Sequence, residues 1–335
     1  SAMVCGGEAV VTATISDEFG NLVEDGTEVD FNIVQGERGD AYPRLTSTVN
    51  GIATTVVRTK SYMFGQPYLD VYILARRETR RVDWQHRLTL LVGLADSVAF
   101  RFTPTPSANG PDSIVEARVR DCAGNNVANG TVVTFTVGAG ALISPTVTTT
   151  DGGFAYSSLR CGCTVGPLNV SAEADGRTFS TVVVIEPGIP DRVSLSISPT
   201  DIMNCGGTAV VTGTVRDVCN NLVRDNTPVL LTPQYGMVSL SQYLLFTKNG
   251  IVTATVRANQ NKRIEPPYWP SGLEQIIGTS GTAMPGFVNL NVRPGAASII
   301  LVSVDPAEIP LNGDVNGYNI TVVANVQDCS TTPVE

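Results

Sequence analysis

The sequence predicts an all-β chain built from tandem β-sandwich repeats. Val and Thr dominate its apolar runs, which is a β-strand signature. No stretch shows the sustained apolar spacing of three to four residues that marks an amphipathic helix. Three sequence markers also recur at a period of about 100 residues, and such a period indicates a tandem array.

The first marker is an aspartate that follows a β-like run and precedes a turn and a second strand. It occurs four times, at spacings of 104, 96 and 111 residues, as Asp17, Asp121, Asp217 and Asp328. The second marker is an Asn/Asp-Gly pair before a strand, at residues 50–51, 151–152 and 249–250. The third marks the start of each new repeat, at Gly93, Gly188 and Gly295.

The strands of the first repeat are expected at VVTATIS (10–16), TEVDFNIV (27–34), IATTVVRT (52–59) and YLDVYIL (68–74). Their alternation would bury one face against a second sheet and leave Thr, Ser and Arg outside. Roughly seven such strands in about 100 residues is the profile of an immunoglobulin-like sandwich. The recurring aspartates fit turns, because their side chains bond nearby backbone amides. The sequence has no DxDxDG calcium loop.

The markers divide the chain into four parts, here called repeats 1 to 4. Repeat 1 spans residues 1–93 and lacks its first strand, repeat 2 spans 94–187, and repeat 3 spans 188–294. Residues 295–335 are the start of an incomplete repeat 4. We expect the sandwiches to lie nearly in line, as a rod of about 130 Å if each strand rises roughly 3.3 Å per residue.

The motifs resemble a known family. DEFGNLVEDGTEVDF, DCAGNNVANGTVVTF and DVCNNLVRDNTPVLL, each followed by an Asn/Asp-Gly strand start, look like the bacterial Ig-like domains of intimin and invasin. The resemblance covers nearly the whole chain and implies stiff stalks on bacterial surfaces. The adhesive tip and the outer-membrane barrel of those proteins have no counterpart in this sequence, so receptor binding does not carry over.

Seven cysteines need their own account: Cys5, Cys122, Cys161, Cys163, Cys205, Cys219 and Cys329. A structural zinc site needs paired ligands such as two CxxC motifs, and only one CxC is present. A catalytic thiol needs a nearby histidine, and His86 lies in an Arg-rich hairpin of a repeat with no cysteine near it. We therefore predict no metal, no cofactor and no catalytic residue. Structural disulfides of an exported protein remain.

Topology suggests which cysteines pair. The run from Cys205 to Cys219 is one strand of roughly 46 Å, whereas a disulfide needs Cα atoms within about 7 Å, so these two do not pair. In an Ig-like array, the exit pole of one repeat meets the turn after strand B in the next. This predicts Cys5–Cys122 and Cys205–Cys329, together with Cys219 bound to either Cys161 or Cys163. One cysteine remains over, and every junction receives a bridge.

Two further features of the sequence are an aromatic pair in repeat 3 and a group of arginines in repeat 1. Tyr268 and Trp269 lie between prolines in an insertion of repeat 3, where they could pack on repeat 4 or contact a glycan or another protein. The arginines of repeat 1 fit a solvated hairpin: Arg76, Arg77, Arg80, Arg81 and Arg87.

A net charge of −9 argues against nucleic-acid binding. The longest apolar runs fall short of a membrane span of roughly 20 residues.

The sequence thus predicts a non-enzymatic stalk or adhesin segment on a bacterial cell surface, stiffened by inter-repeat disulfides. The alternative is a self-assembling subunit of an extracellular filament, sheath or surface layer. Its partners would be neighbouring repeats, copies of the chain, another surface protein or a glycan. The two ends of the sequence also leave two alternatives. Repeat 1 starts at strand B and repeat 4 has only two strands. We therefore expect either a longer parent chain, which we favour, or the addition of a strand from one copy of the chain to the next.

Overall fold

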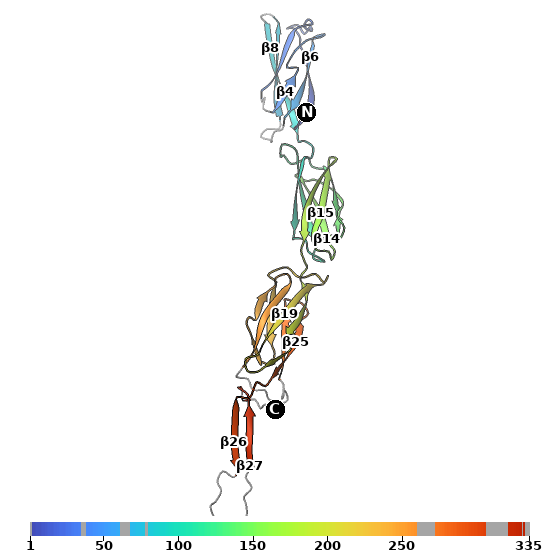
Figure 1. Ribbon diagram of the computed structural model, residues 1–335. Coiled ribbons are helices and arrows are strands. Elements are labelled where there is room, and N and C mark those ends of the chain that lie inside the picture. The colour runs from blue at the N-terminus through green and yellow to red at the C-terminus, as the bar shows by residue number, and fades with distance from the viewer. Residues whose placement is uncertain are drawn as a thin grey trace, which may run out of the picture. The chain divides into compact units, whose positions relative to one another are not determined.

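The computed structural model of the chain describes residues 2–34, 38–60, 68–77, 80–259, 272–305, 321–329 and 331 (Figure 1). All regular elements in this part of the chain are strands, which confirms the all-β prediction. The chain folds as two compact units. Unit 1 comprises Ser1–Pro106, Pro111–Gly162 and Gly166–Ile185, and unit 2 comprises Ser107–Gly110, Cys163–Val165 and Glu186–Glu335.

Repeat 1 consists of a five-stranded and a three-stranded sheet. The first has the order β1 (Ala2–Met3), β8 (Arg80–Leu91), β7 (Tyr68–Arg77), β3 (Glu28–Ile33) and β5 (Leu45–Ser47). The second has the order β2 (Glu8–Thr14), β6 (Ile52–Thr59) and β4 (Gly39–Tyr42). Val29, Phe31, Val57 and Val71 are fully buried in the core of this repeat. The alternating burial along β6 is the one that the sequence predicted.

Repeat 1 contains a two-residue strand before Cys5 that the sequence did not predict. β1 runs parallel to β8, with Ala2 opposite Leu90. The same arrangement recurs in repeat 3, where β18 (Asp201–Met203) runs parallel to β25 (Gly286–Arg293). A two-residue strand gives too short an alternation to be recognised in a sequence. Within the described residues β2 pairs with β6 alone, whereas its counterparts in repeats 2 and 3 pair on both edges.

Repeat 2 consists of two four-stranded sheets. One has the order β12 (Ala141–Ser144), β14 (Phe154–Cys161), β10 (Ser113–Arg120) and β9 (Ser97–Thr103). The other has the order β13 (Val147–Thr149), β11 (Val132–Val137), β15 (Gly166–Ala174) and β16 (Arg177–Ile185). Inward residues of both sheets, among them Val115, Val133 and Phe135, are fully buried or nearly so.

Repeat 3 is also a two-sheet structure. β17 (Pro190–Ser198), β19 (Thr208–Asp217), β23 (Ile251–Ala258) and β21 (Val238–Leu240) form one sheet. β18, β25, β24 (Gly272–Thr279), β20 (Pro228–Pro233) and β22 (Leu244–Phe246) form the other. Its core includes Val211, Leu231, Ile276 and Leu290. Repeat 4 contributes an antiparallel pair, β26 (Ile299–Asp305) and β27 (Thr321–Gln327), labelled in Figure 1.

Candidate functional site at the repeat junctions

Three disulfides lie at the places where one repeat leads into the next. They join Cys5 to Cys122, Cys163 to Cys219 and Cys205 to Cys329, with Cα–Cα distances of 6.2, 5.2 and 6.0 Å. These distances are normal for disulfides. Each bond joins a residue of one repeat to the turn after the second long strand of the following one. The pairs are those expected from the sequence, with Cys163 as the partner of Cys219.

Cys161 is free and buried, so of the two alternatives for Cys219 it is the cysteine that remains over. It is the last residue of β14, and the strand's alternation turns its side chain into the core, where it is 5% exposed. Cys163 follows in the bend after the strand and is exposed, so its sulfur can reach Cys219. Burial raises the pKa of the Cys161 thiol. A protonated, buried thiol is a poor nucleophile, so this residue serves the packing.

A second contact recurs beside each disulfide. The backbone N–H of the linker glycine donates to the Oδ2 atom of the marker aspartate, at 3.0 Å for Gly93–Asp121, 2.9 Å for Gly188–Asp217 and 2.8 Å for Gly295–Asp328. All three aspartates are at most 2% exposed. Because a hydrogen bond to a buried carboxylate is stronger than one between neutral groups, this contact stabilises each linker against its neighbour.

The same aspartates also form the turns that the sequence predicted. Oδ1 of Asp121 accepts the backbone N–H groups of Ala123 and Asn125, at 3.0 and 2.9 Å. Asp17 has the equivalent bonds to Phe19 and Asn21, both at 2.9 Å, but is exposed. The Asx-turn interpretation is therefore correct and incomplete. Sequence reasoning missed the linker bond, although the aspartate and glycine markers recur in step.

The linker glycines are required by the space around them. A Cβ atom on Gly295 would lie 2.2 Å from the Sγ atom of Cys205, and one on Gly188 would lie 2.8 Å from the carbonyl oxygen of Ala108. Gly93 is less crowded, with the nearest atom, the Cβ of Asp121, at 3.1 Å. A side chain at Gly188 or Gly295 would therefore force the linker or its neighbours to move, whereas at Gly93 a shift of a few tenths of an ångström would make room for it.

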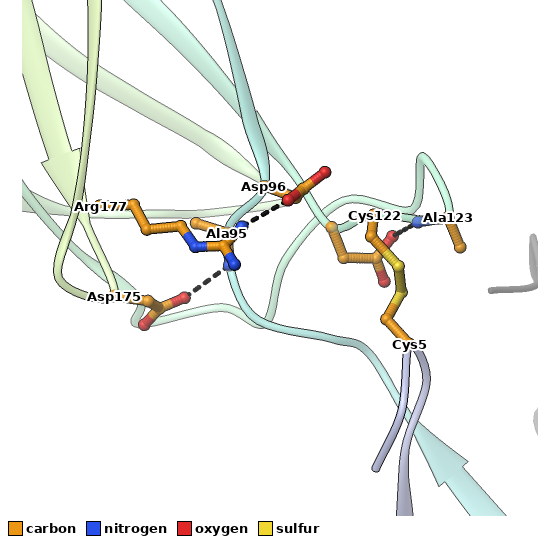
Figure 2. Close-up of polar contacts among 8 residues, drawn as sticks. Cys5, Ala95, Asp96, Cys122, Ala123, Asp175 and Arg177 are labelled. Carbon is orange, nitrogen blue, oxygen red and sulfur yellow. Dashed lines mark hydrogen bonds and ion pairs between the residues drawn. A yellow bond between two sulfur atoms is a disulfide. The ribbon is translucent and has the colours of Figure 1, made fainter. Parts of the chain in front are cut away.

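Figure 2 shows further contacts at the first junction, which lies within unit 1. The backbone N–H of Ala95 donates to Oδ2 of Asp175 at 2.8 Å, and Arg177 forms an ion pair with Asp96. Both Asp175 and Arg177 belong to the loop and strand start between β15 and β16. Since the Arg177–Asp96 pair is largely exposed, it contributes little beside the disulfide and the buried aspartate.

The junction before repeat 3 lies within unit 2 and has its own set of contacts. The side-chain amide of Asn221 donates to the carbonyl of Cys163 at 3.0 Å, beside the disulfide to Cys219. The N–H of Ala108 donates to the carbonyl of Glu186 at 2.8 Å, so a loop of repeat 2 is joined to the linker. Three backbone or side-chain contacts therefore surround each of the first two covalent bridges.

No group of three or more His, Cys, Asp or Glu residues in the described part of the chain is arranged to hold a metal ion. His86 lies on β8, opposite Val71 of β7. In the arginine hairpin, Arg87 pairs with Asp70 at 3.1 Å. Tyr268 and Trp269 lie outside the described residues, so their role as a partner contact stays a prediction. No described helix has the length and hydropathy of a membrane span.

No protein-family model and no curated protein matches the chain. Solved structures do match it. The repeats are similar in fold to invasin-type Ig-like domains. One match is the crystal structure of invasin, a bacterial integrin-binding protein, at 20% identity and a TM-score of 0.49, covering 89% of this chain and 58% of that one. The chain thus spans less than two thirds of the invasin structure.

Two further solved structures match the chain. FdeC, an Escherichia coli adhesin, is 15% identical with a TM-score of 0.47, covering 86% of this chain and 94% of that one. InvD of Yersinia pseudotuberculosis is 19% identical with a TM-score of 0.45, covering 71% and 72%. At these identities the invasin-type likeness concerns the fold alone.

Proposed function

We propose that the chain is a non-enzymatic stalk segment of a bacterial cell-surface protein, in which disulfides hold successive repeats in a fixed orientation. The observation that carries this proposal is the repetition of one junction three times. Each has a disulfide and a buried aspartate that accepts the N–H of the linker glycine. Junctions between domains are ordinarily small, polar and mobile. A second covalent connection beside the linker restricts such motion.

The location follows from the same bonds. Disulfides persist in oxidising compartments, and a chain with six of its seven cysteines paired belongs outside the reducing cytosol. The motif resemblance to intimin and invasin supports the bacterial surface in particular. The partners we propose are neighbouring repeats of the same protein and another surface protein or glycan.

The test of this proposal is the location and state of the natural protein. Antibodies raised against the purified chain should label intact cells of the source bacterium. Protein shaved from those cells should contain the three disulfides when its peptides are mapped without reductant. Protein found only in the cytosolic fraction, with all thiols free, would refute the stalk proposal.

A filament or surface-layer subunit is the second candidate. β26 and β27 expose Ile300, Val302 and Val323. Exposed apolar strands can pair with strands of another chain. Electron microscopy of the purified chain separates the candidates. Single particles that stay single at high concentration favour the stalk, and polymers that persist on dilution favour the filament.

A further inference from the structure

We infer that the three disulfides form a covalent route for tension that bypasses most of the chain, so that pulling on its ends cannot extend repeat 1 or repeat 3. Tension on a cross-linked chain is carried by the shortest covalent route between the two points of attachment. Residues inside a closed loop bear no load once that route is taut. The order of the disulfides along the sequence therefore decides which strands can be pulled open. This inference concerns stretching and does not depend on the proposed surface location.

The first loop removes repeat 1 from the route. Cys5 and Cys122 are 117 residues apart, and the loop that they close contains every long strand from β2 to β8, as well as β9 and β10. Tension entering at the N-terminus passes from Cys5 directly to Cys122. Repeat 1 can then unfold only by thermal motion, since its two sheets lie within a loop that carries no load.

The second and third loops overlap. Cys163 and Cys219 are 56 residues apart, and Cys205 and Cys329 are 124 residues apart. Because Cys205 precedes Cys219 in the sequence, the third loop starts inside the second. The shortest route from Cys219 to Cys329 consequently runs backwards along the strand to Cys205. It then crosses the third disulfide, and the rest of repeat 3 is left out.

The segment between Cys205 and Cys219 is already extended. It contains β19, which pairs with β17 on one edge and with β23 on the other. A β-strand rises roughly 3.3 Å per residue, and a fully stretched chain reaches about 3.6 Å, so this segment can lengthen by only about a tenth. Its inward residues Val211 and Val215 are fully buried. β19 therefore acts as a strap through the core of repeat 3, with a disulfide beyond each end.

One part of the route can lengthen, and it lies in repeat 2. Residues 122–163 connect the first disulfide to the second and include β11, β12, β13 and β14. Extension of the oxidised chain requires these strands to leave the two sheets of repeat 2. Repeat 2 therefore contains the part of the route that can extend, whereas β19 of repeat 3 carries load without extending.

Single-molecule stretching of the full chain, held by handles at its two ends, tests this route. With all three disulfides intact, the fully stretched chain should measure about 25 nm at roughly 3.6 Å per residue along the route. After reduction the same molecule should reach about 120 nm, a roughly five-fold increase. An oxidised chain that stretches to more than 100 nm would overturn the inference.

Double substitutions that remove one disulfide at a time show which bonds lie on the route that carries the tension. Cys205→Ser with Cys329→Ser should lengthen the oxidised chain to about 60 nm, because the route then runs forward through repeat 3. Cys5→Ser with Cys122→Ser should give about 65 nm, and Cys163→Ser with Cys219→Ser about 35 nm. Cys161→Ser is the matched control and should leave the length unchanged. If the stretched length of Cys205→Ser with Cys329→Ser equals that of the wild type, β19 does not carry the tension between Cys219 and Cys205.

Discussion

Each junction aspartate makes two kinds of contact with one carboxylate. In Asp217, Oδ1 accepts the N–H of Asn221 at 2.8 Å within its own turn. Oδ2 accepts the N–H of Gly188, 29 residues earlier in the chain, at 2.9 Å. Asp17 forms the same turn in repeat 1 and has no linker bond among the described residues. Asp17, with the turn bonds alone, is therefore an internal control for Asp217, which has both the turn bond and the linker bond.

Asp217→Ala should cost more stability than Asp17→Ala. Both changes remove the turn bonds, but only the first leaves the Gly188 N–H without its buried acceptor. The difference should be about 1–3 kcal/mol, the usual cost of an unsatisfied buried group. For Asp217→Ala the loss is measured as the drop in hydrogen-exchange protection of the Gly188 N–H, compared with the wild type. Equal losses of stability in the two variants would show that the linker bond contributes nothing.

Gly295→Ala should prevent the third disulfide from forming in its native position. The added methyl group would lie 2.2 Å from the Sγ atom of Cys205, so the linker or the cysteine must move. We expect peptide mapping without reductant to show free Cys205 and Cys329 in this variant. Gly138→Ala is the control, because its nearest contact would be an ordinary 3.5 Å from Leu168. A fully formed Cys205–Cys329 bond in the alanine variant would contradict this account.

At these positions, contacts between residues close together in the sequence could be predicted, whereas contacts between residues far apart in the sequence could not. The turn role of the aspartates followed from neighbours within four residues. The linker bonds span about 30 residues, and their donor is a glycine N–H, which every residue but proline has. Cys161 and Cys163 could not be separated either, because the choice depends on where β14 ends.

At the scale of elements, the long strands were predictable because their burial alternates. In β23 exposed and buried positions alternate strictly, and in β14 buried positions alternate with exposed or half-buried ones. The short parallel strands β1 and β18 were not, since two or three residues carry no readable period. β18 is instead held in place by a charge. Oδ1 of Asp201 accepts the Nε–H of Arg293 from β25 at 2.9 Å.

The pairing of β18 with β25 should weaken in acid. The hydrogen bond from Arg293, helped by Asn291, holds the pKa of Asp201 below its ordinary value. A carboxyl whose folded pKa is lowered stabilises the fold above its unfolded pKa of about 4, and this contribution is lost as the pH falls through the folded pKa. The protection factors of the β18 amides, which correct for the intrinsic pH dependence of exchange, should therefore fall between about pH 5 and 2. In Asp201→Asn that fall should be absent, and an identical pH profile of protection would count against the pair.

For the whole molecule, the cysteine pairs were predictable because the Ig-like topology determines which loops meet at a junction. Three disulfides now connect the four repeats, two within unit 2 and one within unit 1. The nearly linear arrangement of the sandwiches stays a prediction. It depends on linker torsions and side-chain contacts that composition and spacing do not encode.

Reduction should loosen the junctions while leaving the sandwiches folded. Repeats 1 and 3 each bury a hydrophobic core, and inward residues of repeat 2 are likewise buried, so their far-ultraviolet circular dichroism should not change when the bridges are cut. The linkers would then be held only by the aspartate bonds and the other non-covalent contacts at the junctions, and hinge motion, the usual state of domain junctions, should appear. Small-angle scattering should report a broader distribution of molecular lengths in the reduced chain. A variant with serine at the six bridged positions should behave like the reduced chain without reductant. Scattering that does not change on reduction would mean that the disulfides do not restrict bending, and a lost β signal would mean that the repeats need them to fold.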